Sequence, residues 1–505
     1  MRRRDLLPAI AGAPALLRAW KEDPANPAAL QIGDVTAGRA IVWARSARPA
    51  AMTVKWRTTE RSGSETKLIR GPALSARSDF TGRVEISGLP PGQRIFLEVA
   101  LSALDGGGRG EPLRGHFLTP GAGRSPVVVL WSGDMVGQGW GINPDFGGIR
   151  IFETMRRLEP HLFIHSGDSI YADSPVPAEM RLPGGKTWRN VVTEAKSKVA
   201  ETMDEFRGCY RYNLLDDNVR RFSAEVAQLW QWDDHEITNN WSASKDLSAD
   251  ARYREKDIKV LVERGRQAFL EYSPLRLDGN RVYRRISYGP LLDVFLVDMR
   301  SYRGPNTHNR QSIESDETAF LGNPQMTWLA EGLRKSRAAW KIVAADMPIG
   351  LIVGDGKDAE GRARFENCAN GDGPALGREL EIARLLRSIK RSNVRNIVWL
   401  TADVHYTAAH HYDPARAQFT DFLPFYEFVS GPLNAGTFGP GALDNTFGPQ
   451  VLFQKAPPRG QSNLPPSAGM QFFGEVRVAG QELTVTLRDA AGDALYSKTL
   501  ALERG

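Results

Sequence analysis

The chain has 505 residues, of which 41% are hydrophobic and 25% charged, so it has the composition of an ordinary globular protein with room for two or more domains. Its formal net charge of +6 is modest and spread along the sequence, which gives no nucleic-acid-binding signature. No apolar run reaches the roughly 20 residues of a transmembrane helix. Two cysteines, Cys209 and Cys368, allow at most one disulfide and exclude a CxxC metal motif.

The N-terminus combines a basic segment with a short apolar one. Arg2-Arg3-Arg4-Asp5-Leu6-Leu7 precedes a stretch rich in alanine and leucine, which is typical of a short twin-arginine export signal. We therefore interpret residues 1–27 as an export signal and lead-in, and expect a periplasmic or secreted protein. The alternative is a basic start without a signal function, which would leave the protein in the cytoplasm.

Residues 28–120 have the pattern of a small all-β module. Short strands are predicted at 40–43, 51–56, 82–86, 95–100 and 114–118. This spacing predicts an immunoglobulin-like sandwich. Pro120-Gly121-Ala122-Gly123 is a plausible linker, and residues 125–505 form the second predicted domain.

From residue 125 onward, apolar strands alternate with helical patterns, which predicts a layered α/β core. The predicted helices cover residues 148–158, 193–207, 251–272, 323–335 and 378–391. Residues 419–461 are rich in glycine and proline and are expected to form long loops. Antiparallel strands at 472–478, 483–488 and 496–500 are expected to close the edge of a second sheet.

Six short apolar runs in this second region each lead to an aspartate. The runs are 127–131, 161–165, 229–232, 291–297, 340–345 and 396–401, and the aspartates are Asp134, Asp168, Asp233 with Asp234, Asp298, Asp346 and Asp403. Ligands of open α/β sheets collect at the carboxyl ends of the strands. Because carboxylates in one site cannot all stay ionised without compensation, the pattern predicts a site with several metal ions.

Two motifs supply the strongest candidate ligands. In His165-Ser166-Gly167-Asp168-Ser169-Ile170-Tyr171, the glycine permits a tight turn, so that Asp168 can bridge two cations. Tyr171 can bind a trivalent iron as phenolate or hold a water beside it. The alternative is that Asp168 simply caps a helix.

The segment Trp232-Asp233-Asp234-His235-Glu236 is the next candidate. We predict Asp234 as a ligand, His235 as the donor of a proton to a leaving oxygen, and Asn239 as a neutral oxygen ligand. The alternative is a polar loop whose side chains satisfy one another.

Three further positions complete the candidate site. Asp403-Val404-His405 is a D-x-H pair whose side chains can face one cavity, so Asp403 and His405 are predicted ligands. Asp134 follows Ser132-Gly133 at the end of the first run. Arg300 is a catalytic candidate that either clamps a phosphoryl group or, like Arg303, neutralises Asp298.

Together these motifs, with Ser430-Gly431-Pro432-Leu433-Asn434, resemble the PhoD-type alkaline phosphatases of the calcineurin-like metallophosphoesterase superfamily. The resemblance implies a four-layer α/β/β/α core, hydrolysis of phosphate esters, and iron with calcium as the metals. It also implies that Asp168 bridges the metals, that Asp234, Asp403 and His405 bind them, and that His235 lies near the scissile bond.

One departure from this pattern concerns the metals. The family pattern has Ser-Cys-Gln where this chain has Ser132-Gly133-Asp134, so the sulfur ligand is missing. Hard carboxylates also suit calcium, manganese or magnesium, and zinc is possible. We therefore expect Asp134 to supply the ligand of the first strand.

The predicted function is the metal-dependent hydrolysis of a small phosphate ester by metal-activated water. One alternative is a phosphodiesterase, including a phospholipase that acts on a lipid head group. A second alternative, from another class, is a metal-stabilised ligand-binding protein without catalysis.

Overall fold

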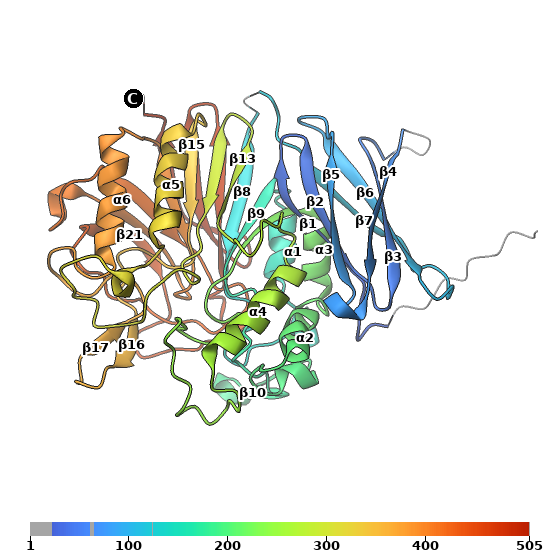
Figure 1. Cartoon of the computed structure of the whole chain (residues 1–505), viewed down its shortest axis with the longest axis horizontal. Helices are drawn as coiled ribbons and strands as arrows, with labels where there is room; N and C mark the ends of the chain where they lie inside the picture. Colours follow the sequence, from blue (N-terminus) through green and yellow to red (C-terminus); the bar gives the residue numbers. More distant parts are fainter. Residues whose placement is uncertain (1–22, 61–64, 124, 504–505) are drawn as a thin grey trace, which may run out of the picture.

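The computed structural model describes residues 23–60, 65–123 and 125–503 (Figure 1). Residues 1–22, which hold most of the possible export signal, lie outside this part. Among the described helices, none is long and apolar enough to cross a membrane.

Two large sheets dominate the molecule. The first has nine strands in the order β24-β23-β22-β8-β9-β12-β1-β2-β5. Its three central strands β8, β9 and β12 are parallel. The bounds are β1 (Ala29–Thr36), β2 (Arg39–Arg45), β5 (Thr81–Ser87), β8 (Val127–Ser132), β9 (Leu162–Ser166), β12 (Ala227–Gln231), β22 (Phe472–Ala479), β23 (Glu482–Asp489) and β24 (Ala494–Ala501).

The second sheet has seven strands in the order β13-β14-β15-β18-β20-β19-β21. Strands β14, β15, β18 and β20 are parallel, and antiparallel strands flank them. The bounds are β13 (Arg284–Tyr288), β14 (Leu292–Leu296), β15 (Trp340–Ala344), β18 (Ile397–Thr401), β19 (Thr407–Tyr412), β20 (Phe425–Val429) and β21 (Pro449–Lys455). The six apolar runs that lead to aspartates are confirmed as the strands β8, β9, β12, β14, β15 and β18.

The largest hydrophobic core lies between the two sheets. Val129 and Trp131 of β8 belong to it together with Ile342 of β15 and Leu400 of β18. Successive side chains of a strand point to opposite faces, so Val128 and Leu130 of β8 point instead into a core on the other face. Trp131 also donates a hydrogen bond from its indole to the carbonyl of Thr401 (3.1 Å), which ties the two sheets together.

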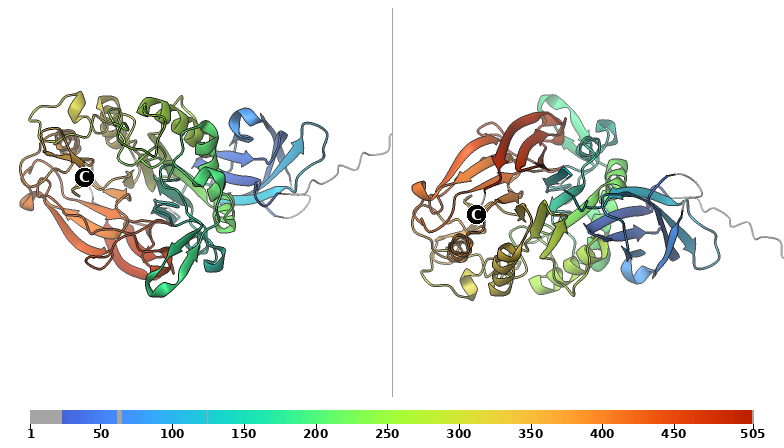
Figure 2. Two further views of the ribbon diagram at one scale, coloured as in Figure 1. Left: turned by 90° about the horizontal axis from the view of Figure 1, so that it is seen from below. Right: turned by 90° about the horizontal axis from the view of Figure 1, so that it is seen from above.

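Helices cover the outer faces of both sheets (Figure 2). The cores outside the nine-stranded sheet include residues of α1 (Ile151–Arg156), α2 (Met203–Asn213), α3 (Asp217–Glu225) and α4 (Ile258–Tyr272). The core outside the seven-stranded sheet includes residues of α5 (Asn323–Lys335) and α6 (Glu379–Arg391). The prediction of a mixed α/β protein is confirmed.

The N-terminal region forms a four-stranded antiparallel sheet in the order β4-β3-β6-β7. Its strands are β3 (Ala50–Arg57), β4 (Lys67–Leu74), β6 (Arg94–Ala103) and β7 (Leu113–Leu118). Its neighbours β1, β2 and β5 continue the nine-stranded sheet, because β1 pairs in parallel with β12 at Gly33 and Gln228. The immunoglobulin-like description and the boundary between residues 120 and 125 stay predictions.

The predicted antiparallel C-terminal strands are confirmed, and they close the edge of the nine-stranded sheet. They extend the first sheet, where β22 pairs antiparallel with β8 and places Gly474 opposite Trp131. A Cβ at Gly474 would lie 2.0 Å from the indole of Trp131, so this pairing requires glycine. Such a long-range pairing leaves no trace in the local pattern.

Three predictions are corrected. Residues 419–461 are not only loops, because they contain β20, which is flanked by β18 and β19, and the edge strand β21. The helix predicted at 193–207 is instead a 3₁₀ turn at Glu194–Lys196 followed by α2, which begins after a capping box of Thr202 and Glu205. Helix α4 begins only at Ile258, where Asp257 caps it.

The remaining described elements are short. The hairpins are β10 (Glu179–Arg181) with β11 (Thr187–Arg189) and β16 (Gly354–Lys357) with β17 (Ala363–Phe365). The possible disulfide does not form: Cys209 and Cys368 are both buried and free, in cores on opposite outer faces of the two sheets.

Candidate metal centre

Polar side chains gather where β8, β9, β12 and β18 end. Three overlapping groups each hold ligand atoms that lie within 4.8 Å of one another. The groups are Asp134, Asp168 and His405; Asp168, Asp234 and His235; and Asp233, Asp234 and Asp403. The structure therefore brings together six predicted residues, and Asp168 and Asp234 each belong to two groups.

The first group contains the carboxylate that stands beside the missing sulfur. Asp134 is 1% exposed, its Oδ1 lies 3.7 Å from Nε2 of His405, and its Oδ2 has no hydrogen-bond partner within the described residues. Asp168 accepts a hydrogen bond at Oδ1 from the backbone N–H of His235 (3.0 Å). This hydrogen bond holds the loop that follows β9 against the loop that follows β12.

The backbone of this centre is unusual. Asp134, Asp168, Asp403 and His405 all have positive φ, between 50° and 66°. Such conformations cost energy for residues other than glycine and cluster at functional sites. Gly167 (φ +95°) is needed for a further reason, because a Cβ there would lie 2.4 Å from the Cβ of Asp233.

Tyr171 and His405 form a pair inside the centre. The hydroxyl of Tyr171 lies 2.8 Å from Nε2 of His405, and Nδ1 of His405 donates to the carbonyl of Gly436. Nε2 therefore carries the lone pair of the neutral ring. Burial lowers the pKa of His405 to about 4, so the ring stays neutral at neutral pH and suits a metal. Burial raises the pKa of Tyr171 well above its usual range.

His235 is oriented by an aspartate that the sequence analysis did not single out. Nδ1 of His235 lies 2.6 Å from Oδ1 of Asp173, and its Nε2 lies 3.9 Å from Oδ1 of Asp234. Burial alone would lower the pKa of His235, but Asp173 and Asp234 raise it to about 9. The ring is therefore protonated at neutral pH and can donate from Nε2. The sequence signal that could have identified Asp173 is its position two residues after Tyr171.

Arg300 is enclosed by carboxylates. Its guanidinium is fully buried and binds Asp233 and Glu366, with Nε 3.5 Å from Asp346 and Nη2 4.0 Å from Asp403. Asp298 instead accepts from the indole of Trp232 (2.9 Å) and from backbone N–H groups, including that of Arg300. The alternative prediction, that Arg300 neutralises Asp298, is therefore wrong, because Arg300 binds Asp233 and Glu366 instead. The predicted phosphoryl clamp stays a prediction.

Asn239 lies at the margin of the centre. Its side chain is exposed, and its backbone N–H donates to Oδ2 of Asp173 (2.8 Å). The adjacent Asn240 makes the closer contact, because its backbone N–H donates to Oδ2 of Asp234. The role of Asn239 as a metal ligand stays a prediction.

The negative charge of the centre exceeds its internal compensation. Around the centre, five buried carboxylate oxygens have no hydrogen-bond partner within the described residues: Asp134 Oδ2, Asp233 Oδ2, Asp234 Oδ1 and both oxygens of Asp346. Burial, and then neighbouring acids, raise the pKa values of Asp134, Asp168 and Asp403 well above the usual range. This set of oxygen donors with one imidazole fits hard or intermediate cations.

Comparison with known protein families gives two adjoining matches. The model of the PhoD-like phosphatase family matches residues 129–488. The model of the PhoD-like phosphatase N-terminal domain matches residues 11–120. A curated relative, alkaline phosphatase D of Bacillus subtilis (strain 168), is 25% identical over 449 residues, which cover 83% of this chain and 71% of the relative.

Two solved structures resemble the fold over most of its length. The structure of PhoD superimposes with a TM-score of 0.69 at 19% identity and covers 94% of this chain and 90% of its own. The purple acid phosphatase PPD1 from yellow lupin seeds gives a TM-score of 0.55 at 12% identity, over 94% of this chain and 74% of its own.

Proposed function

The chain belongs to the PhoD-like phosphatase family and is a phosphoric ester hydrolase, and we propose that it acts through two or more cations held where β8, β9, β12 and β18 end. The observation that supports this proposal most directly is the set of buried carboxylate oxygens that lack hydrogen-bond partners among the described residues. Burying an uncompensated charge is costly, so these oxygens imply positive charge that the protein itself does not supply.

In this proposal Asp168 would bridge the cations, because it is the residue common to the group of Asp134 and His405 and the group of Asp234 and His235. Asp134 and His405 complete one site, and Asp234, Asp233 and Asp403 surround another. Tyr171 would bind beside His405, since its hydroxyl lies 2.8 Å from Nε2 of that ring. When bound, the cations polarise the phosphoryl oxygens and acidify a water.

The protein's own residues then manage protons and orientation. His235 donates from Nε2 to the leaving oxygen, and Asp173 holds the ring through Nδ1 and stabilises its charged form. Tyr171 stacks on the same ring at 4.2 Å between centroids and fixes its plane. Arg300 orients Asp233, a member of one ligand group, through an ion pair.

The identity of the metals depends on the residues that replace the family's cysteine motif in the loop after β8. A Cβ at Gly133 would lie 3.1 Å from both the Cβ of Ala402 and the carbonyl oxygen of Gly167, so the loop is closely packed where the family pattern has cysteine. Asp134 replaces the thiolate with a carboxylate. Iron with calcium remains the family expectation, while the oxygen-rich set also suits manganese, magnesium or zinc.

Three broader features belong to the same proposal. The fold is a four-layer α/β/β/α metallophosphoesterase core with an immunoglobulin-like N-terminal sandwich. The substrate is a small phosphate ester or a phospholipid head group. The basic N-terminus directs twin-arginine export to the periplasm or beyond, since this route carries folded proteins with their metals.

The test combines metal analysis with two substrates. Purified protein should contain at least two metal equivalents by mass spectrometry, and should hydrolyse p-nitrophenyl phosphate or bis-p-nitrophenyl phosphate. The ratio of the two rates separates a monoesterase from a diesterase. Protein that contains metal but hydrolyses neither ester, whichever divalent cation is added, would favour the non-catalytic alternative.

A further inference from the structure

The hairpin of β16 and β17 is tied to the candidate metal centre through the side chain of Asp355, which lies in β16. Oδ1 of Asp355 accepts from Nδ2 of Asn240 (3.2 Å), and Oδ2 accepts from Nδ2 of Asn306 (3.0 Å). Asn240 lies in the loop after β12, Asn306 in the loop after β14, and the hairpin follows β15. One carboxylate therefore joins chain segments that follow strands of both large sheets.

A buried arginine sets the orientation of Asn306 in this arrangement. Oδ1 of Asn306 accepts from Nη2 of Arg378 (3.0 Å), and a guanidinium can only donate. Nδ2 of Asn306 is therefore the donor, and it bonds the carbonyl of Asn240 (3.0 Å) as well as Asp355. Asn240 is thus held at two points, its carbonyl and its side-chain amide.

Asn240 in turn contacts a candidate metal ligand. Its backbone has a φ of +54°, and its N–H donates to Oδ2 of Asp234. Asp234 belongs to two of the three ligand groups, and its Oδ1 has no hydrogen-bond partner within the described residues. The hydrogen bond from Asn240 therefore fixes one oxygen of Asp234 and leaves the other for a cation. Asn240 and Asp355 themselves lie outside the ligand groups.

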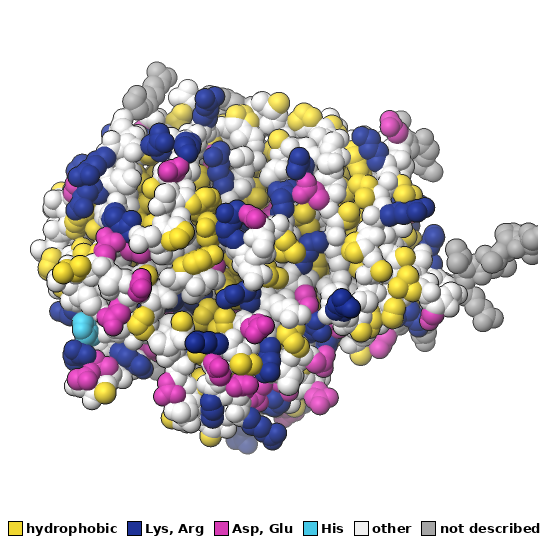
Figure 3. Space-filling view, viewed as in Figure 1, with side chains coloured by type: hydrophobic (Ala, Val, Ile, Leu, Met, Phe, Trp, Pro, Cys, Tyr) yellow, Lys and Arg dark blue, Asp and Glu magenta, His cyan; other side chains and the backbone are white. Residues whose placement is uncertain are grey.

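The carboxylate of Asp355 differs from the charges at the tip of the same hairpin. Within the described residues its ion pair is with Lys245, and the 3.9 Å between Nζ and Oδ1 is too long for a hydrogen bond. At the tip, Arg362 binds both Asp358 (2.7 Å) and Glu360 (3.1 Å). Figure 3 shows acidic and basic side chains side by side in this lower-left part of the molecule. The tip charges compensate one another, whereas Asp355 is directed to the two amides.

We propose that Asp355 is a positioning residue of the metal centre, which acts on Asp234 through Asn240. The inference rests on the proposed cation site. Asp355 holds the side chain of Asn240, the backbone N–H of Asn240 holds one oxygen of Asp234, and that carboxylate presents its other oxygen to the cation. Residues that orient metal ligands in this way typically contribute about 10- to 100-fold to metal affinity.

Treatment of the full, metal-loaded enzyme with increasing EDTA tests this role, with the metal retained per chain measured by mass spectrometry. In Asp355→Ala, the EDTA concentration that removes half of the metal should fall about 10- to 100-fold. Asn240→Gly should have a similar effect, because glycine keeps the positive φ and the N–H but lacks the amide. The double variant should lose no more than the stronger single variant, since both changes break the same link.

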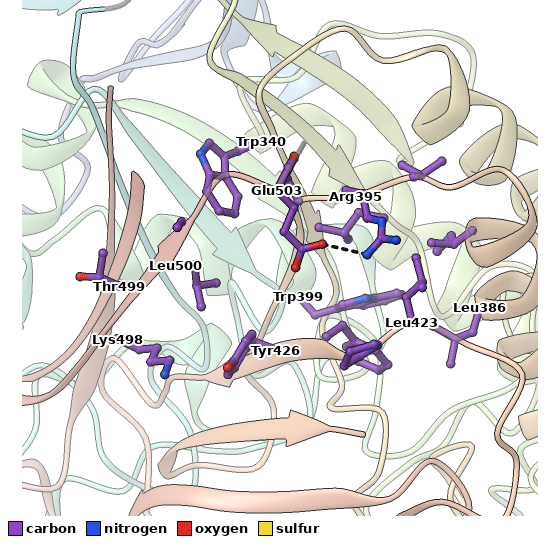
Figure 4. A pocket seen from close by; sticks show the side chains of 17 residues that line it. Trp340, Leu386, Arg395, Trp399, Leu423, Tyr426, Lys498, Thr499, Leu500 and Glu503 are labelled. Atoms are coloured by element: carbon purple, nitrogen blue, oxygen red, sulfur yellow. Dashed lines mark hydrogen bonds and ion pairs between the residues drawn. The ribbon is translucent and has the colours of Figure 1, made fainter. Parts of the chain in front are cut away.

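Two controls should retain metal as the wild type does. Asp358→Ala is the matched control, because it removes a carboxylate from the tip of the same hairpin. Lys498→Met is the distant control: Lys498 lines the pocket of Figure 4, which lies at the first residue of β15, away from the centre. The visible spectrum of cobalt-loaded enzyme reports ligand geometry, and it should change in Asp355→Ala and Asn240→Gly but in neither control.

Wild-type metal retention by Asp355→Ala would overturn the inference. So would additive losses in the double variant, since Asp355 would then act by a route other than Asn240, and so would an equal loss in Asp358→Ala, which would trace the effect to the hairpin as a whole. If Asp355→Ala does not fold, metal retention and the cobalt spectrum of Asn240→Gly decide. Wild-type enzyme that holds no metal would refute the cation site itself, whereas the other outcomes leave that site standing.

Discussion

Two buried carboxylates, Asp34 and Asp346, show how differently this protein treats negative charge in its two halves. Asp34 lies in β1 and is fully buried, and it accepts from the guanidinium of Arg284 (2.8 Å) and from the backbone N–H of Arg276 (2.7 Å). Asp346 is as deeply buried, yet neither of its oxygens has a hydrogen-bond partner within the described residues, and Arg300 approaches only to 3.5 Å.

The difference separates a charge that is compensated inside the fold from one that is not. Asp34 has its compensation inside the fold, so its pair with Arg284 joins the N-terminal strands to the rest of the chain. Around Asp346 one fully buried arginine faces several acids. This region keeps an excess of negative charge, which is what a bound cation requires. Single substitutions on the two sides test the contrast, beginning with the largest expected effect.

Asp168→Asn should abolish hydrolysis, by at least about 10³-fold, since it removes the carboxylate shared by two ligand groups. The fold should persist, because asparagine has the same size and tolerates a positive φ. Turnover of p-nitrophenyl phosphate, metal content and circular dichroism measure the three effects. Wild-type turnover with full metal content would rule out the bridging role.

Asp134→Ala should lower metal content and activity together, by about 10²- to 10³-fold in rate. Its neighbour Ser132 is the matched control, because the hydroxyl of Ser132 is buried and donates to the carbonyl of Phe472 (2.8 Å), away from the ligand groups. Ser132→Ala should cost only about 1 kcal/mol of stability. If both variants lost metal equally, Asp134 would not be the replacement for the family's cysteine.

His235→Ala should reduce kcat by about 10²- to 10⁴-fold with little change in metal content, as expected for a lost proton donor. Asp173→Asn is the companion variant: it keeps the hydrogen bond but removes the charge that raises the pKa of His235. The limb of the activity profile set by His235 should then shift to lower pH. Loss of metal from the His235 variant would make His235 a ligand instead.

Asp34→Asn should destabilise the fold by about 3–5 kcal/mol, because it leaves the largely buried Arg284 without its partner. Metal content and specific activity of the folded protein should stay unchanged, in contrast to Asp168→Asn. Glu85→Gln is the control, since Glu85 is partly exposed in its pairs with Arg39 and Arg276 and should cost at most about 1 kcal/mol. Urea unfolding measures both; equal losses would remove the distinction between buried and surface pairs.

The last prediction concerns the pH dependence of stability and Glu379, at the start of α6. Burial, followed by repulsion from Asp444, raises its pKa to about 9, so folded Glu379 is protonated where the unfolded residue is ionised. Its contribution to stability is therefore complete below about pH 4.5 and is lost as pH rises toward 9, with a slope of at most about 1.4 kcal/mol per pH unit. Glu379→Gln keeps a donor toward Asp444 and should remove this slope. Parallel stability profiles of wild type and variant between pH 5 and 9 would contradict it.

The short strands were predictable from the sequence because a buried run and the polar residues that bound it are local properties. The six runs became β8, β9, β12, β14, β15 and β18, and five of the aspartates that follow them belong to the ligand groups. Helices α5 and α6 also matched, since their amphipathic periodicity needs no partner to be seen. Helix α4 was recognised, but its start was placed seven residues too early, because the cap at Asp257 was missed.

The features that only the tertiary structure decided depend on contacts between distant residues. The nearest carboxylates of Arg300 proved to be Asp233 and Glu366, each more than 60 residues away, and the C-terminal strands joined β8 across more than 300 residues. Asp173 acquired its role only when the loop after β9 met the loop after β12. Periodicity and turn chemistry determine which residues form a strand and which polar residues end it. Strand order and the pairing of buried charges depend on packing and electrostatic compensation across the whole chain, which no short segment contains.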